Sequence, residues 1–444
     1  MNDNERDLIY AKELARLIQV ETISQNGIIG GEKFRVFHKV LKDIFPHVFS
    51  IASVENFHDS LLIKISSPKA LLKPIMLMSH HDVVEPNGEW SHEPFSGDIA
   101  QGKIWGRGTL DTKGNLYVML KACDELISEG YRFNRDIYIE SACTEECEGQ
   151  GAEEISQILE DRGIKFEYTL DEGGMIVYDP IGGADGTYAM IGVGEKGTVD
   201  IKFSAKSQGG HASMPPKHTP LVRLGEFMHE VDNSHIFWTY MDPVIIKLFN
   251  ELSKTMKGYQ AFIFKHAKGL KRLLCKVLPS ISPAAGALLK TTIAFTMASG
   301  SEGRNVLPSE AYVIGNLRYS HHQGRDDSLA VLKTIADKYD IDMEILDLGC
   351  PSKISSYESQ GYKDVVYALS QTYPTVIPTP YIMTGASDSR YFDKVAEACI
   401  RFAPFQISDK QLASIHGIDE CLDIETLHKA VDFFRIIIKG DKHE

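Results

Sequence analysis

The stretch IMLMSHHDVV, residues 75–84, decides the fold, because four apolar residues without alternation lead directly into two histidines and an aspartate. A short continuous apolar run is typical of a strand buried on both faces, as in the parallel sheet of an α/β protein. Such sheets bind ligands beyond the carboxyl ends of their strands. His80, His81 and Asp82 therefore either fill a turn or hold a metal ion, and this stretch alone leaves both options open.

Further polar clusters follow other runs of strand-forming residues. Glu145 and Glu146 end the stretch DIYIESACTEE, and Asp171 and Glu172 end the stretch FEYTLDE. Helical patterns lie between these runs, and alternation of strands and helices predicts an α/β layer with a largely parallel sheet. We expect the clusters to line one crevice at the carboxyl ends of neighbouring strands.

The pattern changes along the chain, and 444 residues are more than one compact core accommodates. Residues 196–350 alternate between strands and a helical stretch, which predicts an inserted α+β domain with a helical excursion at about 234–290. Residues 1–195 and 351–444 are predicted to form the catalytic domain together, because the helix–strand alternation returns near the C-terminus.

The composition is that of a globular protein, with 43% hydrophobic and 24% charged residues. A net charge of −14 argues against a nucleic-acid partner. The N-terminus is acidic and lacks the apolar core of a signal peptide, and no window is long and apolar enough to cross a membrane. Seven scattered cysteines form no disulfide framework, so we expect a cytoplasmic protein. Cys143 and Cys147 have no second pair nearby to complete a thiolate metal site.

Residues 244–276 carry eight lysines and arginines against one acidic residue, interleaved with leucine and phenylalanine. The ordinary interpretation is a pair of helices with one solvated basic face. The alternative is a surface that meets anionic lipid or an amphiphilic substrate.

Two more clusters extend the candidate metal site. GRGTLDTKG, residues 106–114, places Asp111 in a glycine-rich turn before a helix, and SIHGIDE, residues 414–420, supplies His416. Two histidines and three carboxylates form a ligand set that Zn²⁺ accepts, and a shared carboxylate would allow a second ion about 3.5 Å away.

The chain resembles the M20 family of dinuclear zinc exopeptidases and amidohydrolases, in particular its carboxypeptidase S-like branch, which also holds N-acyl amino acid hydrolases. The resemblance is carried, in the family's order, by IQVETIS, SHHDVVEPNGEWSHEPFSGDI, GKIWGRGTLDTKG, TEECEGQGA, LDEGG, GEKG, GGHASMPP, EGRNVLP, GASDSRYF and SIHGIDE. It implies a zinc-exopeptidase-like three-layer α/β catalytic domain with an inserted ferredoxin-like α+β domain for dimerisation and closure.

The family's motifs assign roles around the first zinc. By the resemblance, His80 is a ligand, His81 occupies a variable position, and Asp82 orients His80 from behind, as carboxylates do at metal sites. Asp111 matches the ligand that bridges both ions, and a cis peptide bond is implied between Asp111 and Thr112.

The remaining metal roles follow in the same way. Glu146 matches a ligand and Glu145 the general base. Glu172 aligns best with the next carboxylate ligand, although Asp171 is adjacent and is kept as an alternative. His416 matches the ligand that completes the second zinc. The resemblance therefore implies two Zn²⁺ per chain, and Co²⁺ or Mn²⁺ would also suit nitrogen and oxygen ligands.

Residues further along match substrate contacts of the family. Asn305 matches a residue near the substrate, and Gly385 and Ser387 match a loop that lines the leaving-group pocket. Arg318 and Arg390 are candidates for holding a substrate carboxylate, because a guanidinium binds one with two hydrogen bonds. The alternative for each arginine is an ordinary salt bridge.

His211, in GGHASMPP, matches a histidine that stabilises the oxyanion in the partner subunit's site, which implies a homodimer. The expected activity is hydrolysis of the amide bond next to a free C-terminal carboxylate in short peptides, by a carboxypeptidase or dipeptidase. The alternative is an N-acyl amino acid hydrolase that takes long acyl chains. A non-catalytic binding module or a purely structural oligomer would not need every ligand position filled.

Overall fold

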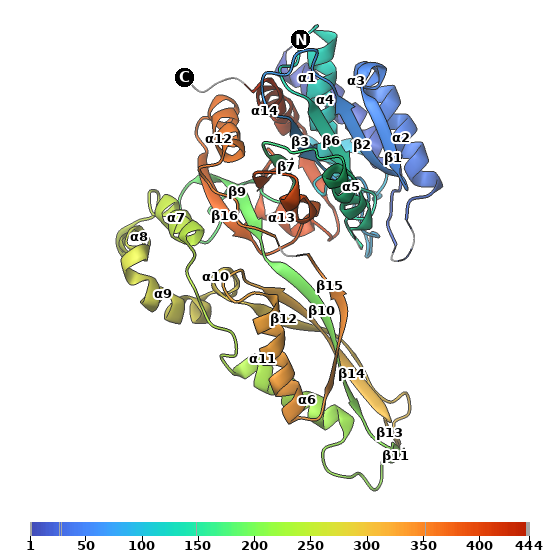
Figure 1. Ribbon diagram of the computed structural model, residues 1–444, viewed down its shortest axis with the longest axis vertical. Coiled ribbons are helices and arrows are strands. Elements are labelled where there is room, and N and C mark those ends of the chain that lie inside the picture. The colour runs from blue at the N-terminus through green and yellow to red at the C-terminus, as the bar shows by residue number, and fades with distance from the viewer. Residues whose placement is uncertain (1, 26, 28, 148, 351, 441–444) are drawn as a thin grey trace.

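The computed structural model describes residues 2–25, 27, 29–147, 149–350 and 352–440. A large mixed sheet occupies one end of the molecule and a smaller antiparallel sheet the other (Figure 1). In the large sheet the strand order is β1-β2-β6-β3-β7-β17-β9-β8-β18, and β16 pairs with β9. These strands are β1 (Ser53–Phe57), β2 (Ser60–Ile65), β3 (Ile75–Met78), β6 (Ile137–Ser141), β7 (Thr169–Asp171), β8 (Ile176–Tyr178), β9 (Thr187–Glu195), β16 (Ile377–Met383), β17 (Cys399–Arg401) and β18 (Gln406–Ile407).

The strand β3 explains why residues 75–78 are all apolar. It lies in the middle of the sheet and pairs in parallel with β6 and β7. Ile75 and Leu77 pack into the core on one face, whereas Met76 and Met78 pack into the core on the opposite face. Both faces are therefore covered, as the uninterrupted apolar run predicted.

Helices complete the other two layers. One face of the sheet is covered by α1 (Asp3–Ile18), α2 (Glu32–Ile44), α3 (Pro46–Ile51), α4 (Lys113–Ser128), α12 (Gln360–Thr372) and α14 (Leu427–Lys439). The opposite face is covered by α5 (Gln150–Asp161) and the 3₁₀ helix η1 (Asp388–Lys394). The predicted three-layer α/β fold is thus confirmed. A three-stranded sheet of β4 (Ile99–Ala100), β5 (Lys103–Trp105) and β19 (Cys421–Asp423), with α13 (Asp409–Ser414) and η2 (Ile424–Thr426), lies beside the layers.

The smaller sheet has the strand order β12-β14-β10-β15. Its elements follow one another as β10 (Gly197–Lys206), α6 (Pro220–Asn233), β12 (Thr292–Ser299), β14 (Glu310–Tyr319), α11 (Arg325–Lys338) and β15 (Asp342–Leu348). This βαββαβ order is that of a ferredoxin-like unit. A short ribbon of β11 (Gly210–His211) and β13 (Val306–Leu307) forms the tip farthest from the large sheet (Figure 1). Lys196 alone separates β9 from β10, so the chain passes directly from the large sheet to the smaller one.

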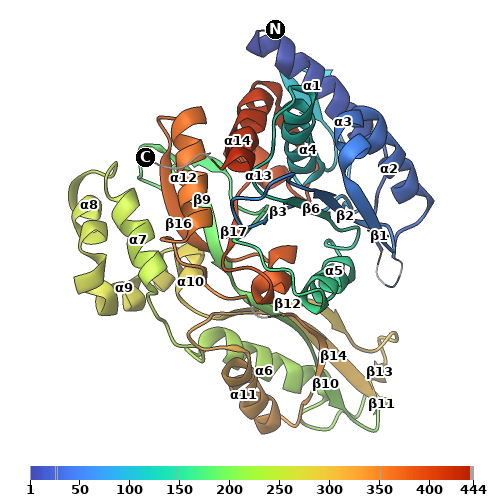
Figure 2. The ribbon, with the colours of Figure 1, turned by 45° about the horizontal axis from the view of Figure 1, so that its top comes forward.

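The helical excursion packs away from the smaller sheet. It consists of α7 (Pro243–Leu252), α8 (Gly258–Lys265), α9 (Ala267–Ile281) and α10 (Pro283–Leu289), and Figure 2 shows these helices beside β9 and β16. Ile245 and Leu248 of α7 share an apolar cluster with Tyr188 of β9 and Tyr381 of β16. These helices therefore pack beside the large sheet, although their sequence lies within the predicted insertion. The division of the chain into 1–195 with 351–444 and 196–350 stays a prediction.

Across the described residues, we find no helix that is both long enough and apolar enough to cross a membrane.

The buried position of β3 makes a prediction about stability. Leu77 is fully buried, so Leu77→Ala is expected to lower the free energy of unfolding by about 2–5 kcal/mol through lost burial and a cavity. Leu71, which precedes the strand and is 72% exposed, provides the matched control: Leu71→Ala should change stability by less than about 0.5 kcal/mol. Urea unfolding measures both, and equal effects would contradict the central position of β3.

Candidate metal centre

The carboxyl ends of three neighbouring parallel strands converge on one place. Because β6, β3 and β7 lie side by side in parallel, the residues that follow them meet at one sheet edge. His80 follows β3, Glu145 and Glu146 follow β6, and Glu172 follows β7. The loop before α4 adds Asp111, and the segment after α13 adds His416. The structure therefore brings together the residues of five distant sequence motifs.

Asp111 lies between the two imidazoles. Its Oδ1 is 3.0 Å from Nε2 of His80, and its Oδ2 is 3.0 Å from Nε2 of His416. Nε2 of His80 also lies 3.4 Å from Oε1 of Glu172, and Nε2 of His416 lies 3.0 Å from Oε2 of Glu146. Two groups of possible ligands thus share one carboxylate, which is the arrangement that a two-cation site requires.

The cluster contains more acidic than basic side chains. Five carboxylates (Asp82, Asp111, Glu145, Glu146 and Glu172) face two imidazoles, and among the described residues no lysine or arginine forms a salt bridge with any of the five. The buried Oε1 atom of Glu146 has no hydrogen-bond partner. Since buried charge is costly unless it is paired or coordinates a metal, these nitrogen and oxygen donors fit divalent cations.

Proton affinities show the same excess of negative charge. Burial, reinforced by nearby carboxylates, raises the pKa of Glu145 well above its usual value. Burial and the charge of Asp111 raise the pKa of Glu172 to about 7. Hydrogen bonds with Asp111 and Glu146 raise the pKa of His416 to about 10. Without cations, the cluster is therefore stabilised by bound protons.

A single carboxylate, that of Asp82, orders two parts of the cluster. Its Oδ1 lies 3.3 Å from Nδ1 of His80, on the side of the ring away from Asp111. The same carboxylate accepts hydrogen bonds from the backbone N–H groups of Glu145, at 3.2 Å, and Glu146, at 3.0 Å. Asp82 therefore orients the His80 ring and fixes the segment after β6 together.

The two adjacent acidic residues after β7 have different surroundings. The carboxylate of Asp171 accepts backbone hydrogen bonds from Glu172 and Ser389, both at 2.8 Å. The carboxylate of Glu172 instead points at His80. The geometry thus favours Glu172 over Asp171 as the group available to a cation.

The loop that carries Asp111 depends on Glu420, a residue to which the sequence analysis gave no role. Oε1 of Glu420 accepts from the backbone N–H of Leu110 at 2.8 Å, and Oε2 accepts from Nη1 of Arg107 at 2.6 Å. The expected cis bond between Asp111 and Thr112 is present in this loop. The pair joins an arginine inside GRGTLDTKG to an acidic residue four positions after His416, and the sequence alone does not show that both side chains are buried together.

Arg318 and Arg390 lie close together without a carboxylate partner. Nη1 of Arg390 donates to the carbonyl of Ser387 at 3.1 Å, and Nε of Arg318 donates to Oδ1 of Asn316 at 2.8 Å. Burial lowers the pKa of Arg318, and the nearby charge of Arg390 contributes. The charge of Glu145 acts on both guanidinium groups. Within the described chain, neither arginine forms a salt bridge, so no carboxylate of the described residues neutralises either guanidinium group by direct contact.

The loop after β16 holds the other two expected substrate contacts. Gly385 is exposed, with open space where a Cβ would lie. Ser387 is buried, and its hydroxyl donates to Oε2 of Glu195 at 2.9 Å. Glu195 in turn accepts from Nε of the buried Arg401 at 2.8 Å. The Ser387 side chain is therefore engaged in a buried network that shapes the loop.

His211 and Asn305 lie apart from the cluster. His211 belongs to β11 at the tip beyond the smaller sheet, and the carbonyl of Asn305 accepts from the backbone N–H of Ala212 in the same region (Figure 1). His211 is exposed, and its Nδ1 lies 2.7 Å from Oγ of Ser213. Neither residue joins the carboxylates of its own chain.

A cavity of about 400 Å³ opens onto the cluster. Asp111, Glu145, Glu146, Glu172 and His416 line one part of it. The rest is mainly apolar, and includes Met175, Val177, Met190, Tyr381, Met383, Leu412 and Ile415. The cavity therefore joins a charged reaction site to an apolar wall.

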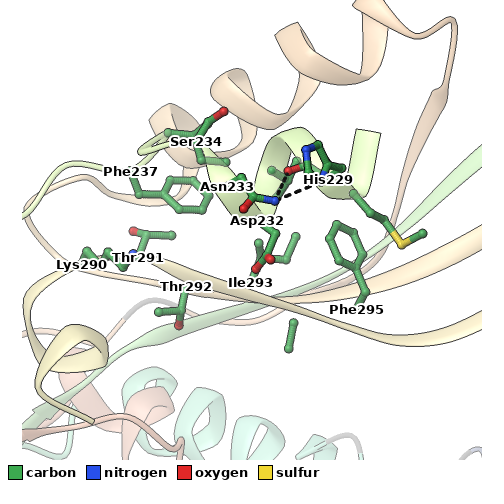
Figure 3. Close-up of a pocket in the computed structure, with 14 residues that line it drawn as sticks. His229, Asp232, Asn233, Ser234, Phe237, Lys290, Thr291, Thr292, Ile293 and Phe295 are labelled. Carbon is green, nitrogen blue, oxygen red and sulfur yellow. Dashed lines mark hydrogen bonds between the residues drawn. The ribbon is translucent and has the colours of Figure 1, made fainter. Parts of the chain in front are cut away.

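A second cavity of about 490 Å³ lies between α6 and β12 (Figure 3). Phe237, Ile293 and Phe295 contribute to its wall, and the amide of Asn233 donates to the carbonyl of His229 at 2.9 Å beside it. None of the predicted site residues lines this cavity, so we do not assign the reaction to it.

Comparisons with known proteins agree with this geometry. The model of the peptidase family M20/M25/M40 matches residues 76–440. A protein named probable carboxypeptidase S-like 2, from Dictyostelium discoideum, is 31% identical over 98% of this chain and 85% of its own. The N-fatty-acyl-amino acid synthase/hydrolase PM20D1.1 of Danio rerio is also 31% identical, over 90% of this chain and 79% of its own.

The fold has counterparts among solved structures. The M20 family metallo-carboxypeptidase Sso-CP2 from Sulfolobus solfataricus superposes with a TM-score of 0.71 at 18% identity, covering 97% of this chain and 98% of the other. The chain belongs to the peptidase family M20/M25/M40. It is a metal-dependent hydrolase that acts on amide bonds, so the predicted family and enzyme class are confirmed.

The role of Asp82 gives a testable prediction. Asp82→Asn is expected to lower the affinity for zinc about 10–100-fold, because the carboxylate that orients a ligating histidine is lost. Competition with a chromophoric chelator measures the affinity. Asp98→Asn is the matched control, since Oδ2 of Asp98 also contacts a histidine, His92, at 3.2 Å but outside the cluster. Equal affinities for the two variants would contradict the orienting role.

Proposed function

We propose that this protein hydrolyses the amide bond next to a free C-terminal carboxylate in short peptides. The observation that carries the proposal is the pair Arg318 and Arg390, which has no salt-bridge partner among the described residues and lies within the field of Glu145. A carboxylate held by these guanidinium groups would place the neighbouring amide bond at the acidic cluster.

The cluster would hold two zinc ions per chain. His80 and Glu172 would bind one ion, His416 and Glu146 the other, and Asp111 both, as their shared contacts suggest. When bound, such cations polarise a carbonyl and lower the pKa of water. Cobalt or manganese would suit the same donors.

Glu145 would act as the general base. It lies beside the ligands without binding a lysine or arginine, and burial raises its pKa well above its usual value. In its ionised form, which cations at the neighbouring ligands would favour, the carboxylate can accept a proton. Glu145 would take the proton from the attacking water and deliver it to the leaving nitrogen, while Gly385 and Ser387 shape the loop beside the leaving group.

His211 would complete the site of a second copy of the chain. In its own chain His211 lies with Asn305 at the tip, away from the cluster (Figure 1). Among the described residues, no strand pairs with the outer side of the edge strand β12, and a cavity lies next to it (Figure 3). These features support a homodimer formed through the smaller sheet, in which His211 donates to the oxyanion in its partner's site. We place this dimer in the cytoplasm, since the scattered spacing of the seven cysteines is not that of a disulfide framework.

An N-acyl amino acid is the second candidate substrate. The bond to be cleaved and the adjacent free carboxylate are the same as in a peptide. The support for this candidate is the 31% identity with the Danio rerio protein named as an N-fatty-acyl-amino acid synthase/hydrolase.

The role of Glu145 predicts the effect of one substitution. Glu145→Gln should reduce kcat about 10²–10⁴-fold for a dipeptide, because the proton acceptor is lost. Zinc content should stay that of wild type, since Glu145 is not required as a ligand. Glu153→Gln, on the exposed face of α5, is the control and should keep full activity. Full activity of Glu145→Gln would exclude it as the base.

The dimer with shared sites predicts that two inactive variants complement each other. Chains with His211→Ala and chains with Glu145→Gln should each be nearly inactive, because every site of either homodimer lacks one group. After unfolding and refolding together, random pairing should restore about one quarter of wild-type activity, from mixed dimers with one complete site. A mixture that stays inactive while forming mixed dimers would contradict the donation of His211 between chains.

A further inference from the structure

The helices α7 to α10 enclose an apolar cavity of about 510 Å³. In the described part of the chain, no charged side chain lines it, and only Tyr259, Gln260 and Ser282 contribute polar side chains. The apolar lining consists of Pro180, Ile181, Gly182, Phe249, Met256, Ile263, Phe264, Leu274, Val277, Leu278, Ile281, Ala284, Ala285 and Leu288. A cavity of this size and composition suits an apolar ligand.

The helix α8 contributes no fully buried side chain to the protein's core. Tyr259 and Phe262 are 76% and 62% exposed, and none of the helix's residues is buried. At the end of α9, Ile281 is 71% exposed. Of these exposed side chains, Tyr259 and Ile281 line the cavity, and exposed apolar groups at a cavity indicate a binding site.

This cavity and the cavity at the carboxylate cluster meet at one turn. Pro180 lines both the apolar cavity and the cavity at the carboxylate cluster. The turn lies between β8 and β9, and Asp179 fixes it by accepting hydrogen bonds from the backbone N–H groups of Gly183, at 2.7 Å, and Ala184, at 2.8 Å. Met175, Val177 and Met190, which line the cavity at the cluster, are also apolar.

We propose that the cavity of α7 to α10 binds the long alkyl chain of an N-acyl amino acid whose amide bond lies at the carboxylate cluster. This inference rests on the proposed cleavage next to a free carboxylate and names what lies on the acyl side. The carboxylate of the substrate binds at Arg318 and Arg390, and the chain runs past Pro180 into the cavity.

The basic side chains of α9 fit this ligand as well. Among the described residues, Lys268, Lys271, Arg272 and Lys276 form no salt bridge, so their charge remains available to attract an anionic amphiphile from solution. These four side chains line neither cavity, so they would attract the ligand from solution but would not contact it in its bound position. A membrane surface would use the exposed apolar groups but would not need an apolar cavity that shares Pro180 with the reaction site.

The test compares substrates that differ only in acyl length. Purified full-length protein with zinc would be assayed on N-acetyl, N-octanoyl and N-dodecanoyl alanine. We expect kcat/KM to rise with length by as much as about fourfold per CH2, the factor given by burial of a methylene group. Equal kcat/KM values across the series would overturn the proposal.

Two exposed positions on α9 give a matched pair of variants. Ile281 lines the cavity, whereas Leu273, which is 57% exposed, does not. Ile281→Asp should lower kcat/KM for N-dodecanoyl alanine at least tenfold and leave N-acetyl alanine unchanged. Leu273→Asp should leave both unchanged. Equal losses in the two variants, together with equal losses of binding to phosphatidylserine vesicles, would identify a membrane-binding face and overturn the proposal.

A binding measurement separates this proposal from the proposed activity. Calorimetry with dodecanoate on metal-free protein should show binding that Ile281→Asp weakens at least tenfold and Leu273→Asp does not. This result would support the cavity even if no amide were hydrolysed, which would count against the proposed function alone. Hydrolysis of N-acetyl alanine with no dodecanoate binding would overturn the cavity and leave the proposed function standing.

Discussion

The gathering of five carboxylates at one edge of the large sheet is the constraint on which the rest of the site depends. Buried carboxylates repel one another, and the two imidazoles do not balance them. The pKa values of Glu145 and Glu172 are raised, because binding a proton removes the negative charge of a buried carboxylate. Divalent cations relieve it without protonating the groups that the reaction needs in their charged form.

The structure holds this repulsive cluster with groups outside it. Asp82 ties the segment after β6 to the ring of His80. Glu420 ties the Asp111 loop to the buried Arg107. Each tie uses hydrogen bonds between segments far apart in sequence, and these bonds hold the ligand-bearing segments in place. Such preorganisation is what a hydrolytic site needs, because binding then costs little rearrangement.

Local sequence patterns predicted the layers well, because both the burial of a strand and the polarity of its end are local properties. The apolar run of β3 indicated a strand covered on both faces, and the polar residues after it indicated the crevice. The order of the motifs supplied the family, which is confirmed by the match over residues 76–440.

Long-range packing could not be predicted in this way. The pattern of α7 indicated helix but not that it packs on β9 and β16, since that contact joins residues more than fifty positions apart. The lack of a salt bridge at Arg318 and Arg390 depends on every neighbour in space, and so does the role of Glu420. The division of the chain into domains stays a prediction. The dimer site stays a prediction too, because it requires two chains.

The most direct test of the account is the zinc content of the full-length protein after equilibrium dialysis against buffered zinc, measured by elemental analysis for wild type and Asp111→Asn. The account predicts two zinc ions per wild-type chain and at most one in the variant, because Asp111 contacts both histidines. A wild-type chain that binds no zinc, or a variant that keeps both ions, would contradict the assignment of the carboxylate cluster as a two-cation site.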